Sequence, residues 1–261
     1  MKKFILITGM GHSGTRHPVS VLQRHPQVFV PQKKLNGVKE FTELHKYFEF
    51  SIDQMSIDDE SYYFDEKKLF KVLDEYFRNS DKEINVIKFP EYPLFCLELF
   101  KKYFNNNFKI IVTKRNFDNI YKSYLNRNEI SRIFYNNSIN FIRYVKKLDK
   151  NDRPDFINLF SREKNYKLLF KKIYDRLDLL ANKAKKEFPL IEINLEDTGN
   201  LNKIYKEVSS FLELDLNIDL NIDGITDKNR LSHKTFYSYK SVLKRKFPKI
   251  YRIYRIYKGY E

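Results

Sequence analysis

A short apolar run at residues 4–8 leads directly into the glycine-bearing segment Gly9-Met-Gly-His-Ser-Gly-Thr-Arg16, and this junction constrains the fold more than any other feature of the chain. Glycine gives such a segment the freedom to turn tightly. Residues 15–24 can then form a helix that ends before His25-Pro26, a pair that breaks helices. The order of strand, loop and helix predicts the start of an α/β fold.

The same alternation continues along the chain. Short apolar runs predict strands at residues 28–30, 84–89, 108–113 and 190–194. Helical spacing of apolar residues predicts helices at residues 66–78, 92–104, 116–127, 131–148, 161–187 and 201–212. Strands that are separated by helices form a parallel sheet with helices on both faces. We therefore expect an α/β fold, a parallel sheet flanked by helices, in a single domain over residues 1–261.

Composition excludes several classes of protein. The chain has 261 residues, of which 42% are hydrophobic, and this is enough for a sizeable core and excludes a disordered chain. Its one cysteine, Cys96, cannot form an intramolecular disulfide, and we expect it in the core of a cytoplasmic protein. No apolar run approaches the ~20 residues of a membrane-spanning helix.

The positive charge is concentrated at the end of the chain. Of the formal net charge of +15, a tail at about residues 228–261 carries +10, from eleven Lys or Arg and one acidic residue. Its sequence KIYRIYRIYKGY interleaves these cations with tyrosine. Such a tail can bind an acidic glycan or make a peripheral contact with the inner membrane surface, and the alternative is a solvated, partly packed helix.

The glycine-bearing segment has the chemistry of a phosphate-binding loop. Gly9 and Gly14 keep a Gly-x4-Gly spacing, in which backbone N–H groups converge on an anion beside the positive end of a helix. Thr15-Arg16 replaces the Lys-[Ser/Thr] pair of nucleotide triphosphatases, and the strand at 108–113 ends in Lys114-Arg115 rather than in a magnesium-binding acid. Such a loop suits a nucleotide that carries phosphates at both ends of its ribose and binds without magnesium.

Arg115 and Ser123 form a second candidate anion site. Arg115 ends a predicted strand, and Asn116 is well placed as the N-cap of the following helix. Ser123 lies about two helical turns beyond the cap. Both side chains can therefore reach one anion at the carboxyl edge of the sheet.

Several segments resemble the sulfotransferases that use 3'-phosphoadenosine-5'-phosphosulfate. The sequence GMGHSGTRHPVSVLQRHPQVFVP is similar to their 5'-phosphosulfate loop and first helix, and RNFDNIYKSY is similar to their 3'-phosphate motif. Lys39-Glu40 and Lys88-Phe-Pro-Glu-Tyr92 resemble two segments of the heparan-sulfate type of glycan sulfotransferases. Residues 190–214 resemble a strand, a Glu-Asp pair and a helix of bacterial and Golgi members, so the resemblance extends over residues 4–214 in order.

The resemblance implies a P-loop-like sulfotransferase fold and an enzyme that moves a sulfuryl group from this donor to a hydroxyl group, on a carbohydrate or glycolipid, without a metal. It implies that Glu40 is the catalytic base and that Lys88 lies at the transfer centre. We expect His12, which replaces the usual lysine or arginine of the loop, to be the third catalytic residue. The residues assigned to the donor are Gly11, His12, Ser13, Gly14, Thr15, Arg16, Arg115 and Ser123.

Two other functions fit parts of the sequence. A metal-dependent small-molecule kinase could use the same loop, but the Walker lysine and the strand-end aspartate are missing. A non-enzymatic polyanion- or nucleic-acid-binding protein would use the tail, but it leaves Arg115 and Ser123 without a role, and no recognised nucleic-acid-binding motif occurs. Within the enzyme, His17 and His45 are rival bases, because imidazole accepts protons near neutral pH.

Overall fold

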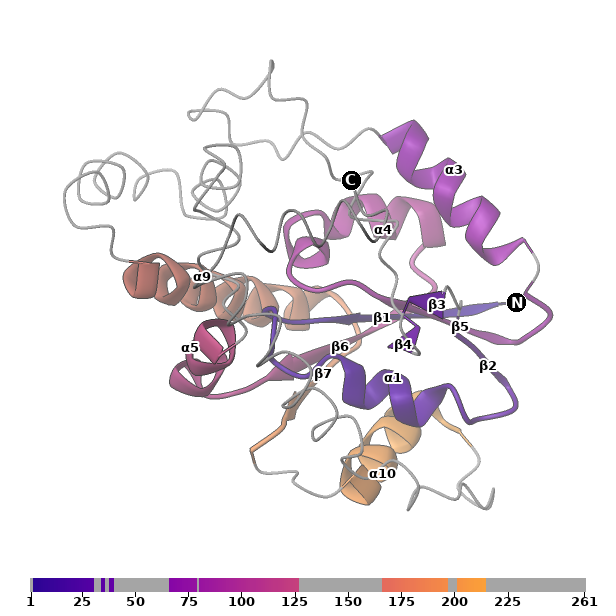
Figure 1. Ribbon diagram of the computed structural model, residues 1–261. Coiled ribbons are helices and arrows are strands. Elements are labelled where there is room, and N and C mark those ends of the chain that lie inside the picture. Colours follow the sequence, from indigo (N-terminus) through magenta and orange to yellow (C-terminus); the bar gives the residue numbers. More distant parts are fainter. Residues whose placement is uncertain are drawn as a thin grey trace, which may run out of the picture.

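Five parallel strands form the main sheet of the computed structural model, which describes residues 2–30, 34–35, 38–39, 66–78, 80–126, 166–196 and 201–214. In spatial order the strands are β2 (Val28–Phe29), β5 (Ile84–Lys88), β1 (Lys3–Thr8), β6 (Phe108–Lys114) and β7 (Leu190–Asn194). Two short strands, β3 (Lys34–Leu35) and β4 (Val38–Lys39), form a separate antiparallel pair. The first strand of the chain, β1, therefore lies in the middle of the main sheet (Figure 1).

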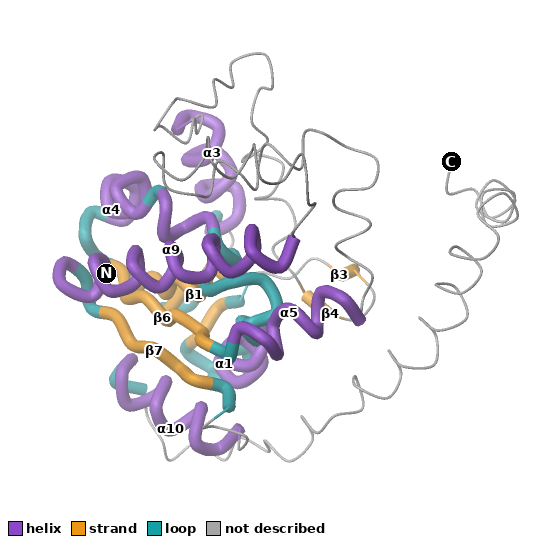
Figure 2. The backbone as a smooth tube through the Cα atoms, turned by 90° about the vertical axis from the view of Figure 1, so that its left-hand side faces the viewer, coloured by secondary structure: helices purple, strands orange, loops and turns teal. Residues whose placement is uncertain are grey.

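Helices cover both faces of this sheet, as Figures 1 and 2 show from two directions. One face carries α1 (Arg16–Leu22) and α10 (Leu201–Leu212). The other face carries α3 (Glu66–Phe77), α4 (Leu97–Phe104) and α9 (Tyr166–Glu187). The helix that follows β6, α5 (Phe117–Asn126), packs on α9 through aromatic rings. The predicted parallel sheet flanked by helices is confirmed.

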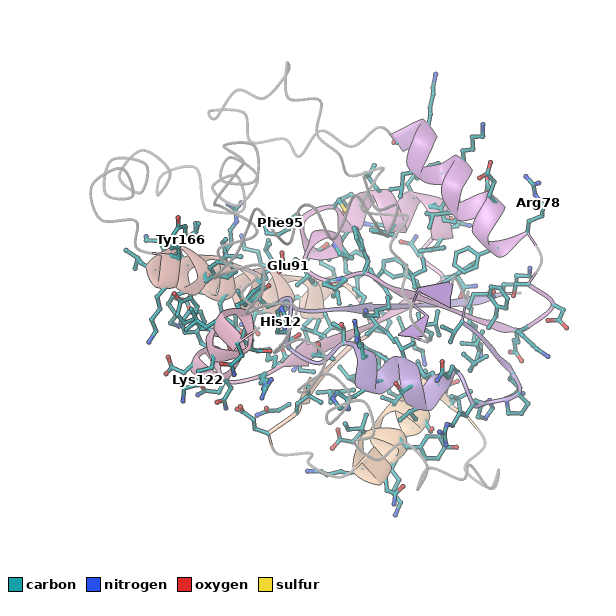
Figure 3. The ribbon with its side chains drawn as sticks, viewed as in Figure 1. His12, Arg78, Glu91, Phe95, Lys122 and Tyr166 are labelled. Carbon is teal, nitrogen blue, oxygen red and sulfur yellow. The ribbon has the colours of Figure 1, made fainter. Side chains whose placement is uncertain are left out.

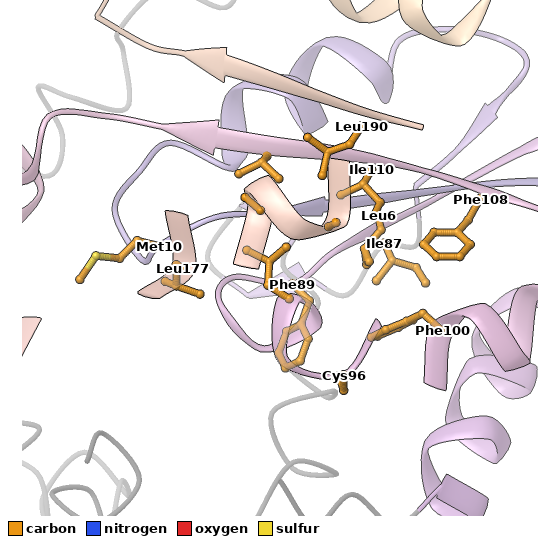
Figure 4. Close-up of a cluster of buried hydrophobic side chains, with 14 of the residues drawn as sticks. Leu6, Met10, Ile87, Phe89, Cys96, Phe100, Phe108, Ile110, Leu177 and Leu190 are labelled. Atoms are coloured by element: carbon orange, nitrogen blue, oxygen red, sulfur yellow. The ribbon is translucent and has the colours of Figure 1, made fainter. Parts of the chain in front are cut away.

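Alternating residues of β1 point into two hydrophobic cores, one on each face of the sheet. Leu6 packs with Ile110 of β6 and with Phe100 of α4 (Figure 4). Ile5 and Ile7 pack on the opposite side, in the cluster that includes residues of α1 and α10. Each fully buried aliphatic side chain stabilises the fold by about 1.5–3 kcal/mol relative to an exposed one. Burial on both faces thus fixes the strand from which the glycine-bearing loop begins.

The predicted helix at residues 92–104 is the main difference between sequence and structure. A 3₁₀ helix, η2 (Tyr92–Phe95), precedes α4, and Cys96 between them has an extended φ of −138°. The N–H of Cys96 donates to the oxygen of Pro93 at 3.1 Å, and this bond closes the 3₁₀ turn. Cys96 is buried as predicted, and burial raises the pKa of its thiol. The predicted helix at 131–148 lies outside the described residues.

Candidate functional site

Three neighbouring strands bring predicted anion-binding residues to one edge of the sheet. The middle strand, β1, continues into the loop of residues 9–15. On one side of β1, β5 ends at Lys88, which lies opposite Ile7. On the other side, β6 leads into Arg115. Because parallel strands have their carboxyl ends at the same edge, Lys88, the loop and Arg115 surround one region, the place where α/β folds bind ligands.

The loop requires glycine at both positions of its Gly-x4-Gly spacing. Gly9 has a φ of +141° and Gly14 a φ of +91°, which side-chain-bearing residues rarely adopt. A Cβ atom on Gly14 would also lie 1.7 Å from Cδ1 of Leu195. Between the two glycines, Ser13 anchors the loop to β6 through a buried contact of 2.7 Å between its Oγ and Oγ1 of Thr113. The loop therefore has a defined shape that depends on its neighbours β6 and residue 195.

His12 connects the loop to α5. Its backbone is left-handed, with a φ of +66°, an uncommon conformation for a residue other than glycine. Its Nδ1 lies 3.1 Å from Oγ of Ser123 on α5, within hydrogen-bond distance. Its ring also packs edge-on against the ring of Tyr124, with 4.1 Å between centroids. Two residues that the sequence assigns to the opposite ends of the nucleotide, His12 and Ser123, are thus in contact.

Arg115 has a different partner. Its Nε lies 3.9 Å from Oε1 of Glu196, a residue that follows β7. The other carboxylate oxygen of Glu196 accepts a hydrogen bond from the N–H of Asn116 at 2.9 Å. Oδ1 of Asn116 accepts one from the N–H of Asp118 at 2.9 Å, which confirms Asn116 as the N-cap of α5. Since Ser123 contacts the loop and Arg115 contacts Glu196, the shared anion site of Arg115 and Ser123 stays a prediction.

Lys114, the residue before Arg115, holds α9 to the end of the sheet. Its Nζ lies 2.5 Å from Oδ1 of Asp178 on α9 and 2.8 Å from Oε1 of Glu192 on β7. Burial by itself lowers the pKa of Lys114, but the hydrogen bonds to Asp178 and Glu192 outweigh it, and the pKa lies above its ordinary value. Of the two cations that the sequence shows at this strand end, Lys114 therefore has a structural role.

Sequence reasoning missed Glu91 and Tyr124, which contact the loop from two other elements. Oε1 of Glu91 accepts hydrogen bonds from the N–H of Gly11 at 2.9 Å and from the hydroxyl of Tyr124 at 3.2 Å. Figure 3 shows Glu91 beside His12, near the end of β1. The helical spacing of Ile120 and Tyr124 indicates a buried face of α5, and a buried tyrosine hydroxyl needs a polar partner. No sequence pattern identifies Glu91 as that partner.

The remaining predicted site residues differ in exposure. Thr15 and the side chain of Lys88 are buried, with Lys88 9% exposed, whereas Arg16 is exposed at the start of α1. The N–H groups of Gly11 and Ser13 already have acceptors, Glu91 and the Met10 oxygen respectively. Those of Gly14 and Thr15 have no hydrogen-bond acceptor among the described residues. These two amides are therefore available to bind an anion.

The predicted catalytic base, Glu40, lies outside the described residues, as do His45 and the basic tail. The other rival base, His17, is exposed in α1. Over the parts of the chain that are described, no group of three His, Cys, Asp or Glu residues could hold a metal ion. No described helix is long and apolar enough to cross a membrane.

Comparison with known proteins identifies the type of fold. No protein-family model and no curated protein matches the sequence. The structure is similar to a crystal structure of a sulfotransferase from Alicyclobacillus acidocaldarius, with a TM-score of 0.50 and 16% sequence identity. The similarity covers 97% of this chain and 99% of that chain. The chain therefore has the α/β, P-loop-like sulfotransferase fold that its sequence predicts.

Proposed function

We propose that the chain transfers a sulfuryl group from 3'-phosphoadenosine-5'-phosphosulfate to a hydroxyl group of a carbohydrate or glycolipid. The observation that carries this proposal is the contact of 3.1 Å between His12 in the loop and Ser123 on α5. It joins the segment that resembles a 5'-phosphosulfate loop to the segment that resembles a 3'-phosphate motif. The fold that the chain shares with a sulfotransferase supports the same reaction.

The residues of the site fit a donor with two separate anionic groups. The amides of Gly14 and Thr15 and the side chains of His12 and Arg16 are assigned to the 5'-phosphosulfate, because backbone amides and cations bind phosphate oxygens. Arg115 and Ser123 are assigned to the 3'-phosphate. The ion pair of Arg115 with Glu196 is long, at 3.9 Å, and partly exposed, so exchange of this carboxylate for a phosphate costs little.

The transfer breaks the bond between sulfur and the phosphate oxygen of the donor and forms a bond between sulfur and the acceptor oxygen. The proposed base, Glu40, takes the proton of the acceptor hydroxyl. Lys88 and His12 donate hydrogen bonds to the sulfuryl oxygens and to the phosphate oxygen on which charge develops. By analogy with phosphoryl transfer, positioning and electrostatic stabilisation supply most of the catalysis.

Release of 3'-phosphoadenosine-5'-phosphate in the presence of a panel of hydroxyl acceptors tests this function. We expect release to depend on a glycan or glycolipid acceptor, to persist in EDTA and to be abolished when ATP replaces the donor. Consumption of ATP that requires magnesium, without any turnover of the phosphosulfate donor, would instead establish the kinase alternative.

The basic tail is proposed to hold an anionic acceptor or membrane surface. Its support is the charge of +10 in about residues 228–261, which lie outside the described residues. Deletion of residues 244–261 is expected to weaken acceptor or vesicle binding and to flatten its dependence on salt, because fewer charge contacts remain to be screened. The measurement is co-sedimentation with vesicles that contain anionic lipid, and a glycan-binding titration, each at several salt concentrations.

Nucleotide binding is expected to survive this deletion, since the loop and Arg115 precede the tail. Loss of folding on deletion would show that the tail is a packing element. An unchanged salt dependence in a folded deletion variant would remove the proposed role of its charge.

A further inference from the structure

A buried carboxylate lies directly against the anion-binding loop. Glu91 follows β5 and is 5% exposed, and its φ of +67° is in the left-handed region. Its N–H donates to the oxygen of Gly9 at 2.8 Å, and its Oε1 accepts the N–H of Gly11 at 2.9 Å. Glu91 is thus bonded to the loop through both its backbone and its side chain. A strained backbone conformation of this kind persists where the surrounding structure fixes it, often beside a functional site.

The same carboxylate oxygen also binds α5. The hydroxyl of Tyr124, which is 3% exposed, donates to Oε1 of Glu91 at 3.2 Å. A Cβ atom on Gly11 would lie 2.2 Å from that hydroxyl. The loop and α5 are therefore so close that only glycine fits at position 11 without a shift of Tyr124. The ring of Tyr124 in turn packs against His12, whose Nδ1 reaches Ser123. Contacts therefore connect Glu91, through Tyr124, to His12 and Ser123 of the proposed nucleotide site.

We propose that Glu91 is a positioning residue, which fixes the loop and α5 relative to each other before the donor binds. This inference rests on the proposed function for its effect on nucleotide affinity, but its effect on the loop is independent of any ligand. One oxygen atom accepts both hydrogen bonds, and the side chain of glutamine also carries an oxygen that can accept them. A loop that is already ordered loses less conformational freedom when an anion binds, and this raises affinity.

Two substitutions separate an acceptor from a charge at this position. Glu91→Gln keeps an oxygen at the same place and removes the charge, whereas Glu91→Met keeps a similar volume and removes both oxygens. Glu98→Gln, at an exposed position on α4, is the matched control. Measured melting temperatures establish whether each variant is folded. If Glu91→Met does not fold, Glu91→Ala serves in its place, because it also removes both carboxylate oxygens and has a smaller side chain.

The backbone amide of Gly11 reports the bond without any ligand. Met10-Gly11 is the one Met-Gly pair in the sequence, so labelling with carbonyl-¹³C methionine and ¹⁵N glycine selects a single amide signal in an NMR experiment. We expect slow hydrogen exchange and a downfield proton shift in the wild type, in Glu91→Gln and in Glu98→Gln. In Glu91→Met, or in Glu91→Ala if that variant replaces it, we expect faster exchange and an upfield shift.

Titration with 3'-phosphoadenosine-5'-phosphate then measures the effect on the site. We expect Glu91→Met to bind about tenfold more weakly than the wild type, and Glu91→Gln to bind at least as tightly. An unchanged Gly11 signal in Glu91→Met, or in Glu91→Ala if that variant replaces it, overturns the proposal. So does a Glu91→Gln variant that behaves like Glu91→Met. If the Gly11 signals change as expected but the wild type binds no bisphosphate, Glu91 still positions the loop and the proposed function fails.

Discussion

Replacement of Glu40 by glutamine is expected to lower turnover of the sulfuryl transfer about a hundredfold or more. Glutamine has nearly the shape of glutamate but cannot take the proton of the acceptor hydroxyl. Affinity for the nucleotide should change little, because the assigned nucleotide contacts come from the loop, Arg115 and Ser123. The measurement is a comparison of kcat and of nucleotide Kd between Glu40→Gln and the wild type.

Glu43→Gln is the matched control for this prediction, since it makes the same change three residues along the chain. It should leave kcat nearly unaffected. Near-normal turnover in Glu40→Gln would remove Glu40 as the base and leave the histidines, His17 and His45, as the groups to test.

Replacement of Arg115 by alanine is expected to remove most of the preference for 3'-phosphoadenosine-5'-phosphate over 5'-AMP. Only the bisphosphate carries the 3'-phosphate that Arg115 is proposed to contact. A hydrogen bond to a charged group contributes about 1.5–3 kcal/mol, which corresponds to a loss of roughly 10- to 150-fold in bisphosphate affinity. Binding of 5'-AMP should be nearly unchanged. Isothermal titration of both nucleotides against both proteins measures the difference.

Lys122 offers a control for charge alone, because it is an exposed cation on α5, next to Ser123 in the sequence. Lys122→Ala should lower both affinities slightly and to a similar extent. If Arg115→Ala lowers the affinity for both nucleotides equally, Arg115 acts through the general electrostatic field of the site and does not recognise the 3'-phosphate.

Much of the fold follows from local sequence patterns. Residues 110–113 are Ile, Ile, Val and Thr, which are all β-branched and buried, as in a parallel strand that helices cover on both faces. The strand at 190–194 and the helix at 201–212 were predicted with the boundaries that the structure has. Asn116 could be identified as an N-cap because a residue that favours caps stands directly between a strand and a helical pattern.

The features of the fold and the site that local patterns do not predict depend on contacts between segments far apart in the sequence. Hydrophobic periodicity does not predict the break between the two helices at Cys96, because apolar residues continue at helical spacing on both sides of it. Glu91 lies in a segment that the resemblance identified, yet its contact with Gly11 joins residues that are 80 positions apart. The sequence likewise predicts that the loop and Ser123 share an edge of the sheet, but the contact between His12 and Ser123 is a result of three-dimensional packing.

Titration of the wild-type protein with 3'-phosphoadenosine-5'-phosphate and with 5'-AMP, both in EDTA, tests the assignment of the donor most directly. The two nucleotides differ by one phosphate at the ribose, where Arg115 and Ser123 are expected to bind. Binding of the bisphosphate at least about tenfold more tightly than 5'-AMP is the predicted result. Equal affinities, or a preference for ATP that appears only when magnesium is added, would contradict it.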